Sequence, residues 1–389
     1  MGDSSSPSGL TLAERLAAAQ REVEGLKGAI EQRRARLADG RLASAVSGAG
    51  AARSPGAALR AVTDATAPRK AGALEAHAGK VCSVDWVGAE RLVSVGNDGA
   101  MLLWNARTRR KLDTFALKSP WVMACAVEKR DLGLVAVGGL DNVCTVYSLA
   151  GREAAAKAKG GGAGEDEDAR IVVELAGHDG YVSSCAFVWG PERVLTSSGD
   201  GSCVLWDVSR GASVSTFRDH AADVMTLASN PSNDSVFVSG SCDATAKVWD
   251  LRACNNGAGG CVMTFEGHES DVNSVAFMRS GAAFATGSDD SCVRLFDLRS
   301  CACVNELRSE DVTHGVTSVA FSASGRLVFA GYDNSDCLAW DCLLEQASRP
   351  AFALNGHNRR VSSVSVSSTG HAVATGSWDA SVQVWVAQA

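Results

Sequence analysis

The side chains that could carry chemistry are histidines and aspartates that recur along the chain. An Asp stands six residues before an aromatic residue in six places, and an Asn does so in a seventh. Histidine and carboxylate side chains at short range can transfer protons, so such sets are candidates for general acid and base catalysis. The polar residues are Asp98, Asp141, Asp200, Asp243, Asp290, Asn334 and Asp379, and the aromatic residues are Trp104, Tyr147, Trp206, Trp249, Phe296, Trp340 and Trp385.

Five repeats also have a histidine 27 to 29 residues before the aromatic residue, namely His77, His178, His220, His268 and His357. An enzyme needs one active site, whereas this chain has a column of similar sets. Because buried polar side chains must be hydrogen-bonded, we interpret the columns as structural. The sequence also has no P-loop, G-x-S-x-G or H-E-x-x-H motif, so we predict no enzyme.

The elements that position these residues follow from the period of the repeats. The aromatic residues recur at intervals of 43 to 59 residues, and each repeat holds four short alternating runs, such as 181–187, 194–198, 203–207 and 214–217. One four-stranded sheet cannot bury both of its faces alone, so we predict an all-β fold, a seven-bladed β-propeller over residues 67–389. The last repeat ends after its third strand, and we expect the segment 69–75 to supply the fourth.

The 13 cysteines are interpreted as reduced and structural. Cys144, Cys203 and Cys337 each stand three residues before an aromatic residue, which marks a repeated position. Cys301 and Cys303 are too close in sequence for a zinc knuckle, so neither a metal nor a cofactor is predicted. The net charge of −7 disfavours nucleic acid as a partner, and no apolar stretch approaches the ~18 residues of a membrane span.

Residues 10–42 are predicted to form a coiled-coil helix, because apolar residues recur every seven positions. Burying each large apolar residue is worth about 1.5–3 kcal/mol, so this seam is expected to need a partner helix. The alternative, that the helix packs on its own propeller, stays open. The seam consists of Leu16, Val23, Ile30 and Leu37 in one column and Leu12, Ala19 and Leu26 in the other, where Arg33 is the polar member.

Three segments have compositions that cannot form a core. Residues 1–9 are predicted to be disordered, 43–66 to be a flexible linker, and 151–170 to be an acidic, Gly-rich surface insertion. Gly2 with Ser6 fits a short N-myristoylation pattern, which leaves acylation open.

The repeats resemble the WD-repeat family, which pairs Gly-His with Trp-Asp. Trp206-Asp207, Trp249-Asp250 and Trp340-Asp341 match this pattern. The resemblance implies a buried, hydrogen-bonded set made of a loop His, a strand Ser or Thr, a turn Asp and the Trp. Residues in such sets would include His178, Asp200, Trp206, Asp243, Trp249, Asp290, Asp379 and Trp385.

Longer stretches resemble the β subunit of heterotrimeric G proteins, among them SPWVMAC at 119–125, GGLDN at 138–142 and ATGSWD at 374–379. Trp104-Asn105 and the stretch 327–332 are similar to the plant and algal form. The resemblance implies an obligate dimer with a γ subunit through the helix, a GDP-bound α subunit on one propeller face, and effectors after release. It also implies indirect membrane contact through lipidated partners, and a location at the cytoplasmic face of the plasma membrane and in the cytoplasm.

Residue types support a binding face independently. Leu140 and Trp378 stand just before a turn Asp, where a solvent-facing turn gains nothing from an apolar side chain but a protein interface does. By resemblance, Lys111 would face the α amino-terminal helix. The other α-facing residues would be Lys80, Trp121, Met123, Leu140, Asn142, Asp179, Tyr181, Asp223, Met225, Cys242, Asp271, Asn273, Asp289, Arg360 and Trp378.

The chain departs from that family at two positions. Cys82 stands where the family usually has Tyr, and Ala100 stands where it usually has Lys. The edge of the α site is therefore expected to be tuned differently. A second interpretation, a WD-repeat scaffold protein without a nucleotide-switched partner, stays open at this point.

Overall fold

The computed structural model describes residues 68–150, 170–255, 258–343 and 349–386. The predicted helix at 10–42 with its seven seam residues, the linker at 43–66 and residues 151–169 of the insertion lie outside the described residues. Arg170, the last residue of the predicted insertion, is buried; it forms an ion pair with Asp113 and lies over the ring of Phe115.

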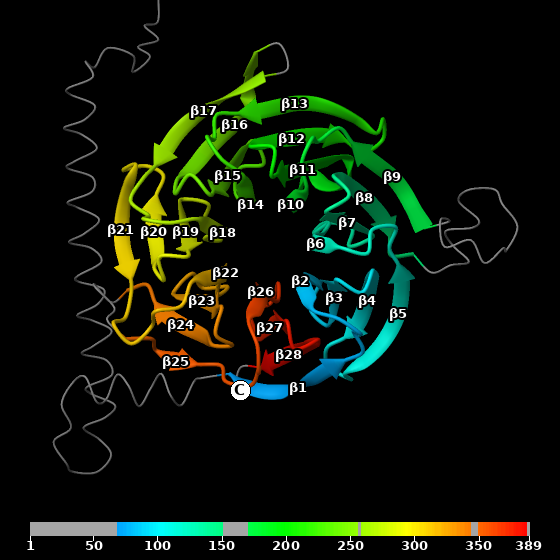
Figure 1. Ribbon diagram of the computed structural model, residues 1–389, viewed down its shortest axis with the longest axis vertical. Helices are drawn as coiled ribbons and strands as arrows, with labels where there is room; N and C mark the ends of the chain where they lie inside the picture. Colours follow the sequence, from blue (N-terminus) through cyan, green and yellow to red (C-terminus); the bar gives the residue numbers. More distant parts are fainter. Residues whose placement is uncertain (1–67, 151–169, 256–257, 344–348, 387–389) are drawn as a thin grey trace, which may run out of the picture. The chain divides into compact units, whose positions relative to one another are not determined.

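The described residues form seven antiparallel four-stranded blades around a central axis, which confirms the predicted seven-bladed, all-β fold (Figure 1). In blades 1 to 6 the first strand lies nearest the axis and sequence order runs outward, whereas in blade 7 the three C-terminal strands run outward and the outermost strand comes from the start of the described chain. Blade 1 holds β2 Val81–Val87, β3 Arg91–Gly96, β4 Ala100–Asn105 and β5 Arg110–Ala116; blade 2 holds β6 Val122–Val127, β7 Leu134–Gly139, β8 Val143–Ser148 and β9 Ile171–Ala176; blade 3 holds β10 Val182–Val188, β11 Arg193–Ser198, β12 Ser202–Asp207 and β13 Ala212–Arg218.

The remaining strands continue around the ring, and blades 3 and 4 are joined at their outer edges. Blade 4 has a long outer hairpin whose second strand pairs in parallel with β13, which the repeat pattern did not predict. The strands are β14 Val224–Ser229, β15 Val236–Ser241, β16 Ala246–Asn255 and β17 Ala258–Phe265 in blade 4; β18 Val272–Phe277, β19 Ala283–Ser288, β20 Val293–Asp297 and β21 Ala302–Leu307 in blade 5; β22 Val316–Phe321, β23 Leu327–Tyr332, β24 Cys337–Asp341 and β25 Phe352–Ala353 in blade 6; and β26 Val361–Val366, β27 Ala372–Ser377 and β28 Ser381–Val386 in blade 7.

The ring is closed by the strand that the sequence predicted. β1 (Arg69–Glu75) pairs antiparallel with β28 as the outer strand of blade 7, so the earliest and latest described strands share one sheet (Figure 1). Leu74 on this strand is 1% exposed and packs with Val382 and Trp104 between blades 7 and 1. Closure therefore depends on apolar burial as well as on strand pairing.

Truncating this side chain is expected to loosen the closure. Leu74→Ala removes a fully buried side chain, and such changes cost about 2–5 kcal/mol. We expect the free energy of unfolding, measured by urea titration, to fall by an amount in that range. The control is Leu112→Ala on β5, whose side chain is half exposed and should change stability little.

Hydrogen bonds between blades make the ring rigid near the axis. A Ser or Thr hydroxyl on one inner strand accepts the backbone N–H of the next, for example from Val84 to Ser363 and from Val319 to Ser274, at 3.1 and 3.0 Å. Cys144, Cys203 and Cys337 are fully buried, as predicted, and the described cysteines are free thiols. Within the described residues, no helix could cross a membrane, and no three His, Cys, Asp or Glu side chains gather to hold a metal ion.

Candidate protein interaction face

The His and Asp columns are engaged in structural hydrogen bonds. In blade 3, His178 Nδ1 lies 2.8 Å from Asp200 Oδ2, and His178 Nε2 lies 2.7 Å from Thr196 Oγ1, which also accepts the Trp206 Nε1–H. We call this set a tetrad. Equivalent tetrads are His77, Asp98, Ser94 and Trp104 in blade 1, His220, Asp243, Ser239 and Trp249 in blade 4, and His357, Asp379, Thr375 and Trp385 in blade 7.

Three blades depart from the tetrad in the described part of the chain. Blade 2 has Tyr147 in place of the Trp and no histidine in register. Blade 5 keeps His268, Asp290 and Thr286 but has Phe296 in place of the Trp. Blade 6 has no histidine in register; there the buried Tyr332 hydroxyl lies 3.1 Å from Trp340 Nε1 and takes over its hydrogen bond. These side chains are buried and paired in structural contacts, which is the role that the sequence predicted for them.

The tetrads tie stability to pH. Burial raises the pKa of Asp243, but hydrogen bonds from Thr245 and His220 outweigh burial and hold the pKa at about 2. Burial also raises the pKa of Asp290, but the hydrogen bond with His268 outweighs burial and holds the pKa at about 2. Burial lowers the pKa of His220, against the raising effect of the Asp243 carboxylate.

We therefore expect stability to fall on acidification in two stages. In the unfolded chain the histidines take up protons near pH 6.5. In the folded protein His220 and His357 stay neutral to lower pH, because burial lowers their pKa. The unfolded state therefore binds more protons below about pH 6.5, and the free energy of unfolding should decrease there. The carboxylates of Asp243 and Asp290 add a second loss between about pH 4 and pH 2. Urea unfolding at a series of pH values measures both stages, and a constant stability from pH 8 to pH 5 would contradict the first.

One face of the ring is organised by a backbone hydrogen bond that recurs in every blade. The residue after the second strand donates its N–H to the carbonyl of the residue before the inner strand, at 3.0–3.1 Å. We call these residues the rim pairs, because they lie at the same end of each blade. They are Lys80 with Asn97, Trp121 with Leu140, Tyr181 with Gly199, Asp223 with Cys242, Asp271 with Asp289, Gly315 with Asp333, and Arg360 with Trp378.

The rim pairs bring together most of the predicted α-facing residues. Four members of the rim pairs, Asn97, Gly199, Gly315 and Asp333, were not among the predicted α-facing residues, and only their place in the repeat could have signalled them. Asp333 forms an ion pair with Arg360 at 3.1 Å. Met123, Met225 and Asn273 are each the second residue of an inner strand, directly beside a rim pair. Asn142 and Asp179 lie in the adjoining turns, whereas Lys111 lies on the outer strand β5, away from the rim pairs.

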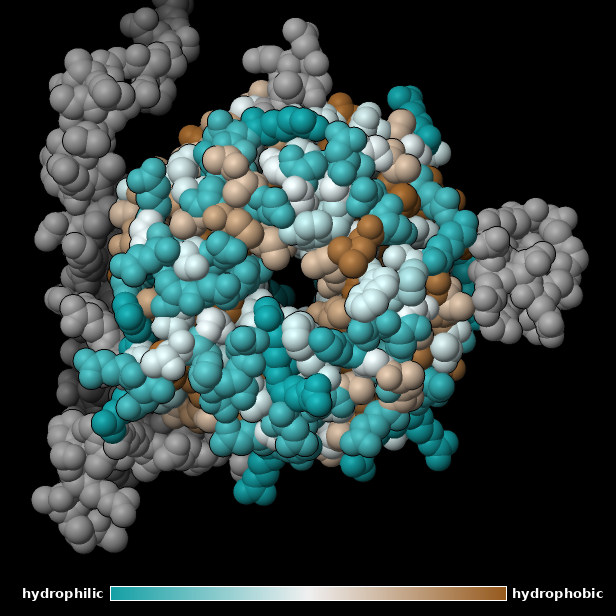
Figure 2. All heavy atoms as spheres, viewed as in Figure 1, coloured by the Kyte–Doolittle hydropathy of each residue, from teal (hydrophilic) through white to brown (hydrophobic). Residues whose placement is uncertain are grey.

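The rim pair of blade 2 is the apolar sector of this face. Trp121 and Leu140 are 56% and 52% exposed, which is unusual for side chains of this size. Figure 2 shows one side of the ring, where hydrophobic side chains border the central opening over β6 and β7. Exposed apolar groups beside a rigid turn are typical of a protein interface centre.

Blades 7 and 1 form a cation-aromatic sector. The Lys80 ammonium lies 3.7 Å from the ring centroid of Trp378, and the Arg360 guanidinium carbon lies 4.9 Å from it. Two cations on one indole hold the ring in a fixed position, since each is attracted to the π face. The half-buried position of Trp378 is explained by these contacts.

Blades 3 to 5 form an acidic sector. The Tyr181 hydroxyl donates to Asp223 at 2.9 Å and lies 3.4 Å from Met225 Sδ. Asn273 Nδ2 donates to Asp289 at 2.6 Å. Burial, and then the surrounding carboxylates of which Asp271 is the foremost, raise the pKa of the Cys242 thiol to about 12, so the thiol stays protonated at neutral pH.

The face therefore offers a partner three chemically distinct sectors on a stiff ring. Apolar anchors lie beside a cation-aromatic stack on one side and beside carboxylates on the other. A protein surface bound here would be restricted to one orientation, because a rotated partner would meet like charges.

Comparisons with known proteins agree with the fold and the repeats. A family model described as "G protein beta WD-40 repeat protein" matches residues 20–386. The guanine nucleotide-binding protein subunit beta of Oryza sativa subsp. japonica is 43% identical over 327 residues, which cover 80% of this chain and 82% of the relative. The proteins of the same name from Arabidopsis thaliana and Solanum tuberosum are 40% and 39% identical over 388 and 390 residues, with 96% of both chains covered in each case.

Proposed function

The chain belongs to the G protein β WD-40 repeat family, and from that premise we propose that it is the β subunit of a heterotrimeric guanine-nucleotide-binding protein. In this proposal the rim face binds a GDP-bound α subunit, and the freed face engages effectors to transduce a receptor signal. The observation that carries the proposal is the exposed Trp121 and Leu140 pair, flanked by the Lys80, Trp378 and Arg360 stack. The tetrads support a binding role rather than catalysis, because their His and Asp side chains already have structural partners.

The proposed mechanism is population control. A partner that changes shape between its GDP and GTP states binds this face with two different affinities, and only that difference can drive release. A stiff ring suits this role, since the rim pairs and the bonds between blades fix the position of the anchors. Effectors would then contact the same side chains after the α subunit leaves.

The experiment that tests the proposal is co-expression of the full chain with candidate γ chains, followed by α capture with GDP and with a non-hydrolysable GTP analogue. We expect capture with GDP and release with the analogue. Capture that is indifferent to the nucleotide would favour the scaffold interpretation instead. Deleting residues 1–45 further distinguishes a β subunit from a scaffold protein. A scaffold propeller should still fold without these residues, whereas a β subunit would lose its γ partner.

The γ subunit is proposed to pair with the helix predicted at 10–42. The double variant Val23→Asp with Ile30→Asp places two carboxylates in the apolar seam. The free energy needed to bury each unpaired charge is far larger than the free energy gained from burying the original apolar side chain. We expect this double variant to abolish recovery of a complex with γ, measured by co-purification. Glu24→Gln, outside the seam, is the control, and normal co-purification of the double variant would refute the assignment of the seam.

The location follows from the partners. The family resemblance implies lipidated partners, and on that basis the complex is proposed to lie at the cytoplasmic face of the plasma membrane, with a further population in the cytoplasm. Imaging of a fluorescent fusion with and without the γ chain tests this proposal, since membrane signal should depend on γ.

A further inference from the structure

Five exposed arginines lie at the edge of the propeller that is opposite the rim pairs. The rim pair of blade 1 follows β3 and precedes β2, whereas the arginines lie where β1, β3 and β5 begin and where β4 ends. We call them the arginine edge. They are Arg69 at the start of β1, Arg91 at the start of β3, Arg107 and Arg109 in the turn between β4 and β5, and Arg110 at the start of β5.

Strand register brings these side chains together. Asn105 on β4 pairs with Arg91 on one side and with Arg110 on the other, so both arginines lie on the same face of the sheet. Neighbouring strands are about 4.8 Å apart, which places the Cα atoms of these two arginines about 10 Å apart. Arg109 reaches the next blade, because its Nη1 donates to the Ala71 carbonyl on β1 at 3.2 Å. The edge is therefore one patch that crosses the junction of blades 1 and 7.

Few acidic side chains balance this edge. Arg107 pairs with Glu90 at 3.5 Å, through side chains that are 80% and 58% exposed. Asp113, the carboxylate on β5, is already paired with Arg170 at 2.9 Å. Within the described residues, the other four arginines form no ion pair. The edge is thus a positive area on a chain whose net charge is −7.

Two exposed apolar side chains border the arginines. Leu112, two residues after Arg110 on β5, is 50% exposed, and Val386, which pairs with Arg69, is 40% exposed. Cations beside exposed apolar groups suit a membrane surface, where the cations meet headgroups and the apolar side chains lie at the boundary of the acyl chains. Arginine also suits phosphate, because its planar guanidinium donates two parallel hydrogen bonds to phosphate oxygens.

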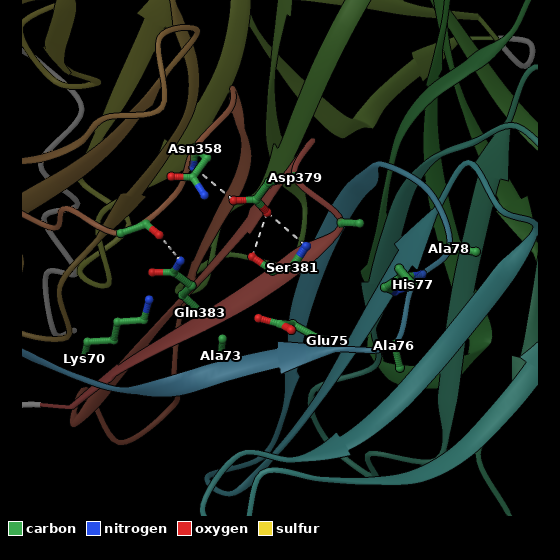
Figure 3. Close-up of a pocket in the computed structure, with 12 residues that line it drawn as sticks. Lys70, Ala73, Glu75, Ala76, His77, Ala78, Asn358, Asp379, Ser381 and Gln383 are labelled. Carbon is green, nitrogen blue, oxygen red and sulfur yellow. Dashed lines mark hydrogen bonds between the residues drawn. The ribbon is translucent and has the colours of Figure 1, made fainter.

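Two neighbouring lysines are not counted in the edge. Lys70 is directed toward Gln383, in the polar hollow between β1 and β28 (Figure 3). Lys111 directly follows Arg110 but is a predicted α contact. The arginine edge can therefore be tested separately from the proposed α site.

We propose that the arginine edge binds the headgroup phosphates of an anionic phospholipid membrane. Its guanidinium groups donate to phosphate oxygens, while Leu112 and Val386 lie at the headgroup boundary. Because the rest of the chain carries a net negative charge, an anionic surface attracts this edge and repels the remainder, which favours one orientation. The rim pairs lie at the opposite ends of the strands and stay accessible. This contact is direct and adds to the membrane contact proposed through lipidated partners.

The test is sedimentation of the full chain, alone or with an unlipidated γ partner, with sucrose-loaded vesicles of phosphatidylcholine or of phosphatidylcholine mixed with phosphatidylserine. We expect binding to the mixed vesicles only, and release as sodium chloride is added, because salt screens the contact. No binding to mixed vesicles, or equal binding to both kinds, would overturn the proposal. A soluble oligoglutamate that binds as tightly as the mixed vesicles would assign the edge to an acidic protein segment and would also overturn it. Nucleotide-dependent α capture is measured separately, so the failure of one proposal is distinguishable from the failure of the other.

Variants locate the contact. Arg91→Gln with Arg110→Gln removes two exposed charges that form no ion pair among the described residues. Each basic residue at an anionic surface contributes about fivefold to affinity, so this double variant should bind mixed vesicles about thirtyfold more weakly. Arg218→Gln with Arg279→Gln removes the same charge from exposed positions on blades 3 and 5, and this matched control should leave the affinity unchanged. Equal vesicle binding by the two double variants, with thermal unfolding like that of the native chain, would contradict the assignment.

Discussion

Replacing Trp121 and Trp378 by alanine is expected to abolish capture of a GDP-loaded α subunit. Interface tryptophans at the centre of a contact typically cost 2 kcal/mol or more on truncation. The two side chains lie on blades 2 and 7 with blade 1 between them, so their losses should add. The double variant should therefore bind at least about 1000-fold more weakly, which surface plasmon resonance or pull-down measures directly.

The two single variants are expected to differ in character. Trp121→Ala removes an exposed side chain and leaves its neighbours in place. Trp378→Ala also removes the ring that Lys80 and Arg360 share, so part of its loss comes from the Lys80 charge, which is no longer held in position, while Arg360 keeps its ion pair with Asp333. The salt dependence of binding should therefore change in the second variant more than in the first.

Controls separate an interface effect from a folding effect. Val214→Ala removes an exposed apolar side chain from the outer strand of blade 3 and should leave α capture unchanged. Thermal unfolding and γ pairing should match the native complex in all of these variants. Undiminished α capture by a folded double variant would show that the partner binds elsewhere on the propeller.

The repeat pattern was sufficient to predict the blades because each blade is a local unit. The run 181–187 was predicted as a strand, and β10 spans Val182–Val188. The closure by β1 was predictable for a different reason, since a repeat that ends after three strands needs a fourth. Both inferences use only periodicity and the requirement that sheet faces be buried.

Features that depend on contacts between distant residues were not predicted. In blade 6, which has no histidine in register, the Tyr332 hydroxyl accepts the Trp340 hydrogen bond instead. A column of repeated positions in the sequence cannot reveal such a substitute. The parallel pairing of β13 with β17 depends on how far one hairpin extends beside its neighbour. The cations over Trp378 come from blades 1 and 7, which only ring closure brings together.

In the candidate face, too, local features were predictable from the sequence and long-range contacts were not. Residue types alone singled out Leu140 and Trp378, because apolar side chains are misplaced in solvent-facing turns. The backbone bond that aligns every rim pair, and the division into apolar, cation-aromatic and acidic sectors, needed the structure. Family resemblance supplied the list of residues, whereas geometry explains why most of them lie on one face of the ring.

Removing a tetrad carboxylate is expected to have the largest effect on stability. Asp243 accepts four hydrogen bonds, from His220 Nδ1 at 2.8 Å, from the Ala221 N–H at 3.0 Å, and from the Thr245 N–H and hydroxyl at 3.0 and 2.6 Å. Asp243→Ala would leave the buried His220 ring nitrogen and three further donors without a partner. Losses of this kind cost about 3–5 kcal/mol, so the urea midpoint should fall strongly.

The chain contains its own control for this prediction. Asn334 occupies the same column in blade 6, where the histidine is absent, and among the described residues it bonds only with Asp336 in its own turn, at 2.8 and 3.1 Å. Asn334→Ala should therefore cost no more than about 1 kcal/mol. The difference in stability loss between Asp243→Ala and Asn334→Ala therefore measures the contribution of the tetrad apart from that of the turn. If both variants lost the same stability, the turn rather than the buried His and Asp pair would be what holds the blade, and the structural role assigned to the tetrads would be wrong.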